Sequence, residues 1–126
     1  MAKQFSVALD DKPGELAKLA GALAEKGINI KTASQASLGG KGVVNLITND
    51  EARTRDVLRT QKFSFSEDEV LVARLDDKPG ALAQVAKNLA AARINIKALG
   101  LLSNAGPKVE VALAVDQPEK AKSIVK

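Results

Sequence analysis

The fold of this chain can be read from residues 10–31, DDKPGELAKLAGALAEKGINIK, because a second version of them follows at residues 76–97, DDKPGALAQVAKNLAAARINIK. The two versions align without a gap at an offset of 66 positions (77 − 11 = 66). The chain has 126 residues. It therefore consists of two equivalents of one small unit.

Each copy predicts a strand, a turn and a helix. The tetrapeptide Asp-Lys-Pro-Gly stands between an apolar run (residues 5–9 or 70–75) and a helical pattern. Pro13 and Pro79 suit the first helical turn, because their φ is already set and they lack an N–H that would be unpaired there. Asp11 and Asp77 are expected to cap the exposed helix donors.

Gly14 and Gly80 follow within that same predicted turn. Glycine weakens a helix relative to alanine, but without a Cβ it lets another group approach the backbone N–H donors at the positive helix end. This combination suits an anionic or zwitterionic small ligand.

An apolar stripe at helical spacing follows each glycine and predicts a helix with one buried face. The stripe consists of Leu16, Leu19, Ala20 and Leu23 in the first copy and Leu82, Val85, Ala86 and Leu89 in the second. Gly27 ends the first helix, whereas Arg93 stands at that position in the second copy. The second helix is therefore expected to close without the left-handed glycine cap.

The composition excludes several classes of function. The chain has no cysteine, histidine, tryptophan or tyrosine, which removes the usual metal ligands and the Cys-His and Ser-His nucleophile systems. We therefore expect no metal site, no cofactor and no catalytic residues. No apolar run reaches membrane-spanning length and the N-terminus has no signal-peptide pattern, so no membrane contact and a cytoplasmic location are expected.

The formal charge of +4 and the isoelectric point near 9.4 raise the question of nucleic acid. The basic residues form no cluster, and three phenylalanines supply few stacking platforms. A solvated, lysine-rich surface is the favoured interpretation, with no nucleic-acid partner.

The rest of each copy completes a β-α-β-β-α-β order. Gly39-Gly40 predicts a hairpin turn, and the apolar runs at 43–48 and 109–115 predict strands flanked on both sides within a sheet. A capped helix is expected from about Asn49 to Gln61, with its arginines (Arg53, Arg55 and Arg59) facing solvent. Residues 62–66 are the predicted last strand of the first unit, and residues 67–69 link it to the second. A helix at 117–126 leaves the second unit without a final strand.

The repeated D-x-P-G-x-L motif, followed by a helix and I-N-I in this element order, resembles the ACT domain family of small amino-acid-binding regulatory modules. The tandem arrangement is similar to short bacterial and archaeal proteins made of two such domains. The resemblance implies an α+β fold: two ferredoxin-like βαββαβ units packed side by side, with helices on one face of antiparallel sheets and the second unit's final strand missing. The domains are expected at residues 1–67 and 68–126.

The resemblance also implies a ligand site where two domains meet. One domain contributes the loop after its first strand and its helix start, and its neighbour contributes an asparagine at the start of its second strand. The matching residues are Asp11, Lys12, Pro13, Gly14, Glu15 and Leu16 with Asn95 and Ile96, and Asp77, Lys78, Pro79, Gly80, Ala81 and Leu82 with Asn29 and Ile30.

Such a site favours binding without turnover. Helix N–H groups suit the carboxylate of a free amino acid, and an asparagine carbonyl suits its ammonium group. Asn29 and Asn95 also have a purely structural interpretation, because an asparagine before a strand often hydrogen-bonds local backbone. A unit of about 60 residues buries only ~60% of its unfolded surface, so we expect pairing and a homodimer, whose second chain can close the open edge of the second unit.

Three functions are compatible with the sequence. The first is an amino-acid-responsive regulatory protein, acting alone or on an enzyme or transporter. The second is an interaction or scaffold protein without a ligand, acting through oligomerisation with an enzyme partner. The third is an enzyme using Ser, Lys or carboxylates, such as the Asp10-Asp11 and Asp76-Asp77 pairs. It ranks last, because adjacent residues in a strand point to opposite faces and these carboxylates do not converge. The amino acid bound, the number of working sites and the process regulated are not encoded in any pattern we recognise.

Overall fold

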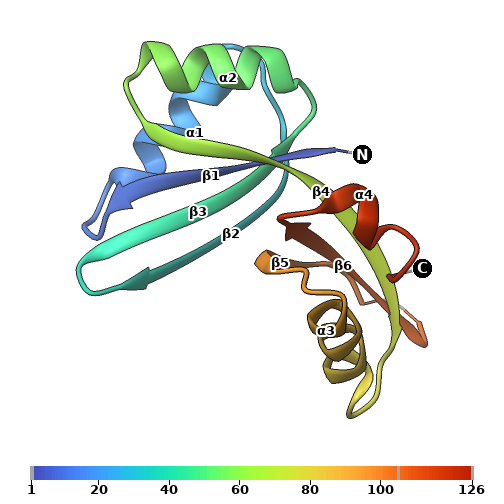
Figure 1. Ribbon diagram of the computed structural model, residues 1–126. Helices are drawn as coiled ribbons and strands as arrows, with labels where there is room; N and C mark the ends of the chain where they lie inside the picture. The colour runs from blue at the N-terminus through green and yellow to red at the C-terminus, as the bar shows by residue number, and fades with distance from the viewer. Residues whose placement is uncertain (1, 105, 126) are drawn as a thin grey trace. The chain divides into compact units, whose positions relative to one another are not determined.

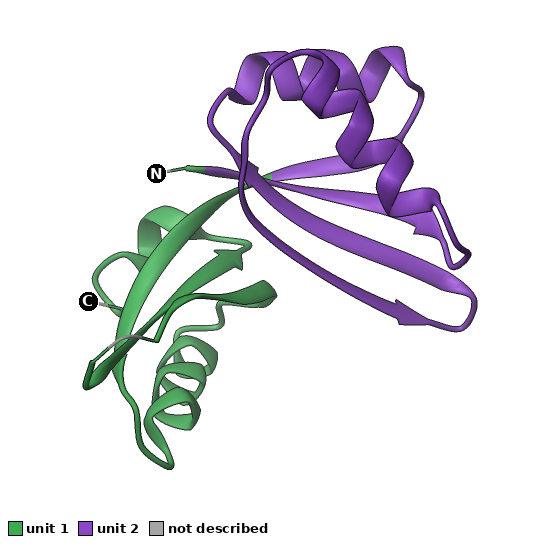
Figure 2. Cartoon of the chain, turned by 180° about the vertical axis from the view of Figure 1, so that it is seen from behind, with its two compact units in different colours: residues 1–2, 68–126 green, residues 3–67 purple. Residues whose placement is uncertain are grey.

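The computed structural model describes residues 2–104 and 106–125 of the chain. Its elements follow one another as β1 (Lys3–Asp10), α1 (Glu15–Glu25), β2 (Ile30–Leu38), β3 (Lys41–Thr48), α2 (Glu51–Thr60), β4 (Ser64–Asp76), α3 (Ala81–Ala91), β5 (Ile96–Ser103), β6 (Lys108–Val115) and α4 (Pro118–Ala121) (Figure 1). They form two compact units (Figure 2). The N-terminal unit is Lys3–Glu67, and the C-terminal unit holds Ala2 and the described residues from Asp68 onward. No helix in the described ranges is long and apolar enough to cross a membrane.

The N-terminal unit has an antiparallel sheet in the order β2-β3-β1, with the start of β4 next to β1. Residues Gly39 and Gly40 form the predicted turn between β2 and β3, and both have positive φ, 62° and 81°. Two consecutive positive φ values are typical of a tight hairpin turn whose twist matches the strands. Strand β3 is flanked on both sides, which confirms the interpretation of its apolar run.

One face of this sheet carries both helices, as Figure 1 shows for α1 and α2. The core between them contains side chains from β1, β3, α1 and α2, which include Phe5, Val7, Leu19, Leu23, Leu46 and Leu58. Each of these six side chains is almost fully buried. Complete burial of one such side chain stabilises a fold by about 1.5–3 kcal/mol, so this core is the main favourable term for the unit.

The C-terminal unit repeats the arrangement with the antiparallel order β4-β6-β5. Its core includes Leu71, Leu89, Leu113, Ala121 and Val125. No strand follows α4 in the described part of this unit, which agrees with the expected missing strand. The predicted helix at 117–126 is wrong in length, because α4 ends at Ala121 and turns follow it; Lys126 lies outside the described residues.

The predicted link at residues 67–69 is also wrong, because β4 is one continuous strand of 13 residues. Charged residues at its centre are held by partners within their own units. Arg55 of α2 binds Glu67 through two hydrogen bonds of 2.6 Å, and Lys97 of β5 binds Asp68. Arg55 is therefore half-buried and paired, not solvent-facing as expected. These pairs make a charged stretch compatible with a strand.

Helices α1, α2 and α3 end in the same way. A residue with positive φ follows each helix: Gly27 (69°), Lys62 (62°) and Arg93 (60°). The N–H of this residue donates to the carbonyl oxygen three residues back, as in Arg93 N to Ala90 O (2.9 Å). The next N–H donates to the carbonyl oxygen five residues back, as in Ile94 N to Leu89 O (2.9 Å). This is a Schellman motif. Arg93 was expected to prevent it, but it adopts the strained left-handed conformation instead.

Candidate functional site

The Asp-Lys-Pro-Gly loops join β1 to α1 and β4 to α3. Gly14 and Gly80 have φ of 92° and 90° and lie just before the helices, not inside their first turns. Their carbonyl oxygens accept the first helical hydrogen bonds, from Lys18 N (3.0 Å) and Gln84 N (2.9 Å). The predicted helix start at the prolines is therefore wrong by about two residues. The left-handed conformation explains why glycine stands there.

No side chain in the described ranges caps α1 or α3. Asp11 and Asp77 were predicted to do so, and this prediction is wrong: both are exposed loop residues. Helix α2 gives the contrast, because Asp50 Oδ1 accepts a hydrogen bond of 3.0 Å from Arg53 N. The first-turn N–H groups of α1 and α3 thus lack the side-chain acceptor that α2 has. Ala81 N donates to Lys78 O (3.4 Å), and the next N–H groups of each first turn, those of Leu16 and Leu82, can take an acceptor from outside.

Open space surrounds both loop glycines. A Cβ placed on Gly14 or Gly80 would meet no other atom within 4 Å. Glycine is therefore required by its φ and not by crowding at its Cβ position.

Leu16 and Leu82 were predicted to belong to the buried stripe of their helices, and this is wrong. They are 44% and 45% exposed, whereas Leu19 is fully buried one turn later. Leu16 and Leu82 are the second residues of α1 and α3, so the stripe is exposed in the first turn of each helix. Each loop is therefore followed by a leucine whose apolar surface is available for contact.

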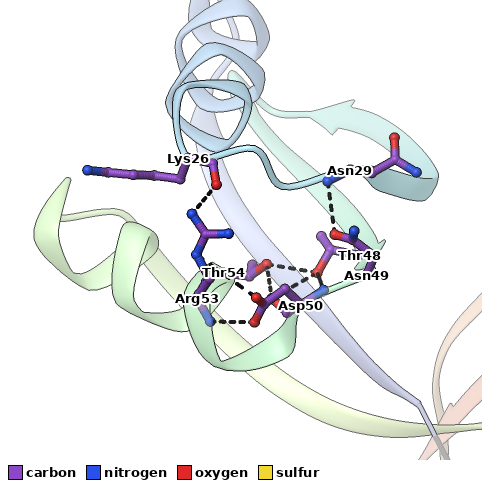
Figure 3. Close-up of polar contacts among 7 residues, drawn as sticks. All are labelled: Lys26, Asn29, Thr48, Asn49, Asp50, Arg53 and Thr54. Carbon is purple, nitrogen blue, oxygen red and sulfur yellow. Dashed lines mark hydrogen bonds and ion pairs between the residues drawn. The ribbon is translucent and has the colours of Figure 1, made fainter.

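Asn29 and Asn95 are fixed through their backbones. Asn29 N donates to Asn49 Oδ1 (3.0 Å) while Asn49 N donates to Asn29 O (3.1 Å), and Asn95 is held in the same way by Asp116. Figure 3 shows the Asn29 side chain pointing away from Asn49. Neither side-chain amide of the pair makes a hydrogen bond within the described residues, and both residues are exposed. The structural interpretation, in which these amides bind local backbone, is therefore not what the structure shows.

The buried hydroxyl groups of Thr48 and Thr54 hydrogen-bond at the end of β3, next to Asn49, the partner of Asn29 (Figure 3). Thr54 is fully buried, and its Oγ1 lies 2.7 Å from Thr48 Oγ1 and 2.7 Å from Asp50 O. Arg53 donates from Nη2 to the carbonyl oxygen of Lys26 at the end of α1. In the C-terminal unit Lys120 Nζ plays this part, with 2.6 Å to Ala92 O. Hydrogen bonds therefore hold the backbone at and just before Asn29 and Asn95.

Each unit has a depression beside its first helix. The depression of the N-terminal unit has a volume of about 520 Å³ and that of the C-terminal unit about 450 Å³. Six pairs of positions 66 residues apart line both: Ala8/Arg74, Leu9/Leu75, Asp10/Asp76, Glu15/Ala81, Lys18/Gln84 and Gly42/Lys108. The C-terminal depression also includes Lys78, Pro79 and Gly80 of the loop. Arg74 and Gln84 were not among the predicted site residues, although both differ from the residues at the same positions of the first copy, Ala8 and Lys18.

A lysine in the neighbouring strand pairs with the aspartate at each strand end. Lys41 Nζ lies 3.2 Å from Asp10 Oδ1, and Lys108 Nζ hydrogen-bonds Asp76 Oδ1. The hydrogen bond and charge of Lys108 hold the pKa of Asp76 below its usual value. Asp76 therefore stays ionised at neutral pH.

A single unit does not bring its own loop and asparagine together. The loop precedes an 11-residue helix and the asparagine follows it, which separates them by about 16 Å at 1.5 Å per residue. Ile30 and Ile96, which the prediction included, are half-buried and pack against the cores of their units. The pairing of each loop with the asparagine of the other copy stays a prediction.

Comparison with known proteins identifies the family. The sequence pattern described as "ACT domain pair" matches residues 2–126. The chain belongs to this family. The expected resemblance is thereby confirmed, and the α+β fold of an ACT domain pair agrees with the elements described above. No curated protein matches the chain.

Solved structures share the fold of this ACT domain pair. The protein BT0572 from Bacteroides thetaiotaomicron is 25% identical, with a TM-score of 0.79 over 98% of this chain and 85% of that one. The ligand-free regulatory subunit of aspartate kinase from Thermus thermophilus is 18% identical, with a TM-score of 0.68 over 98% and 89%. A structure of aspartokinase alpha and beta subunits is 22% identical, with a TM-score of 0.68 over 97% and 88%. ACT domains are regulatory modules, and the family assignment supports a regulatory protein.

Proposed function

We propose that this ACT domain pair is a regulatory protein that binds a free amino acid at its two Asp-Lys-Pro-Gly loops. One observation carries the proposal. In both copies a left-handed glycine precedes a helix whose first-turn N–H groups have no side-chain cap, and no other atom lies within 4 Å of where the glycine's Cβ would stand. A duplicated loop that leaves these donors open suits a ligand carboxylate.

The chemistry of the ligand follows from the groups around each loop. The carboxylate accepts hydrogen bonds from the first-turn N–H groups, which are stronger than neutral ones because the acceptor is charged. The side-chain oxygens of Asn29 and Asn95 are free to accept from the ammonium group. Leu16 and Leu82 offer apolar surface to the rest of the ligand.

Regulation requires that the ligand binds one of two states more tightly. A second chain, giving a homodimer, and a regulated enzyme or transporter belong to the same proposal. Light scattering of the purified protein at micromolar concentration tests the first: a mass of twice 13.2 kDa is expected, and a mass of one chain contradicts it.

A thermal-shift screen of the standard amino acids tests binding. A ligand at ~100 times its dissociation constant adds roughly 2.7 kcal/mol of stability, so a clear rise in melting temperature is expected for one amino acid or a few related ones. The double variant Asn29→Ala with Asn95→Ala should lose this rise without losing stability, because both side chains are exposed and unpaired.

The matched control is Gln35→Ala, an exposed polar residue on β2 that belongs to neither predicted ligand set. It should keep the ligand response of the wild type. Melting curves that no amino acid shifts would reject the proposal and favour the interaction or scaffold protein.

A further inference from the structure

The depressions of the two units are lined by different segments and carry different charges. Its lining includes Gly80 and Lys78 of the loop, together with Arg74, Gln84 and Lys108. The lining of the N-terminal depression includes no residue of Lys12–Gly14; the segment that leads into β4, Gln61–Ser64, takes part instead. In the C-terminal unit the loop residues Lys78, Pro79 and Gly80 line the depression directly.

The charges of the two linings also differ. Three cations and two carboxylates line the N-terminal depression: Lys18, Lys41, Lys62, Asp10 and Glu15. Three cations and a single carboxylate line the C-terminal one: Arg74, Lys78, Lys108 and Asp76. The change from Glu15 to Ala81 removes a negative charge at the helix start, and the change from Ala8 to Arg74 adds a guanidinium on the strand.

Two of these cations are only loosely compensated. Arg74 Nε lies 3.6 Å from Glu110 Oε2, and Lys78 Nζ lies 3.9 Å from Asp76 Oδ2. Both distances are longer than a hydrogen bond. Asp76 is already engaged by the hydrogen bond from Lys108. Arg74 and Lys78 therefore have donors left for another carboxylate, and a guanidinium can bind one through two parallel hydrogen bonds.

We propose that the C-terminal depression receives the side chain of the bound amino acid, and that this side chain carries a carboxylate, as in aspartate or glutamate. The inference rests on the proposed function. The ligand's own carboxylate lies at the start of α3 beside Gly80, and its side chain extends across the depression to Arg74, since both residues line it. Glu15 disfavours the same acidic ligand in the N-terminal unit, so the two sites are not equivalent.

Titration calorimetry of the full chain with glutamate, glutamine, aspartate and asparagine tests this proposal. Each acid is matched by an amide of the same shape, so their comparison isolates the charge. We expect one acid to bind at least about tenfold more tightly than its amide, as two charge-assisted hydrogen bonds imply. Arg74→Ala should remove this difference, and Ala81→Glu should do the same by restoring the first copy's carboxylate.

Lys87→Ala is the matched control, because it removes one positive charge from the exposed face of α3 outside the lining. It should keep the acid preference. Arg74 is exposed, so its variants should fold, and their melting temperatures check this; Arg74→Gln serves as a second variant that keeps the bulk.

Equal affinities for acids and amides would overturn the inference, and so would a preference that survives Arg74→Ala or disappears in Lys87→Ala. If a neutral amino acid binds instead and shifts the Gly80 amide resonance, only this inference fails. If no amino acid binds at all, the proposed function fails with it.

Discussion

Arg93→Gly should stabilise the protein, because Arg93 holds a left-handed conformation that its counterpart Gly27 adopts without strain. Its φ is 60° and that of Gly27 is 69°. A side chain in this region costs about 1–2 kcal/mol. Glycine brings a larger unfolded-state entropy, worth roughly 0.5–1 kcal/mol in the opposite direction. The net gain is about 0.5–1 kcal/mol, or roughly 2–8 °C in melting temperature for a unit of this size.

Urea unfolding of the full chain, followed by circular dichroism, measures this gain. Arg93 is exposed, and the hydrogen bond from Gln117 reaches its backbone oxygen, so the substitution leaves that contact in place. The reverse variant Gly27→Arg is the matched control and should lose about 0.5–1 kcal/mol, the same balance with the opposite sign. A destabilised Arg93→Gly, or a Gly27→Arg as stable as the wild type, would refute the reasoning.

Urea unfolding also tests three further predictions about the stability of single variants. Asp50→Ala should cost ~1 kcal/mol because it removes the cap of α2, whereas Asp11→Ala should change stability by less than about 0.5 kcal/mol; equal losses would show that Asp11 does cap. Leu23→Ala should cost about 2–5 kcal/mol and Leu16→Ala far less, and a large loss for Leu16 would mean that it is buried. Hydrogen bonds from the Arg55 guanidinium lower the pKa of Glu67, so the pair stabilises the fold above about pH 4.3, and this contribution is lost as the pH falls through the lowered pKa. The stability advantage of the wild type over Glu67→Gln should therefore shrink as the pH falls through that range. An advantage that stays constant with pH would contradict the assignment.

The element order was predictable because the sequence repeats itself and each copy carries the same apolar periods. The loop geometry was not. Pro13 and Gly14 fit a helix start by residue preference, yet Gly14 takes a left-handed φ and delays the helix. Leu16, in the first turn of α1, is exposed although it shares the helical period of the buried Leu19 and Leu23, so periodicity alone does not reveal its exposure. Continuity of β4 also escaped prediction, because partners distant in sequence hold its charged residues.

Only those residues of the candidate site that belong to the repeated motif could be predicted from the sequence. Gly80 and Asn95 follow from the repeated motif, whereas the depression also needs Arg74 and Lys108 from two paired strands. Their proximity depends on strand register, which the sequence does not state. Likewise, Asn95 is held through its backbone by Asp116, which is 21 positions away, and its side chain takes no part in these hydrogen bonds.

The central claim is that the duplicated loops hold a free amino acid, and an amide-resolved NMR titration of the full chain tests it most directly. With the amino acid that raises the melting temperature most, the account predicts saturable shifts centred on Gly14, Gly80 and the first turns of α1 and α3. Saturable shifts confined to other parts of the chain, with the two glycine amides unmoved, would contradict it.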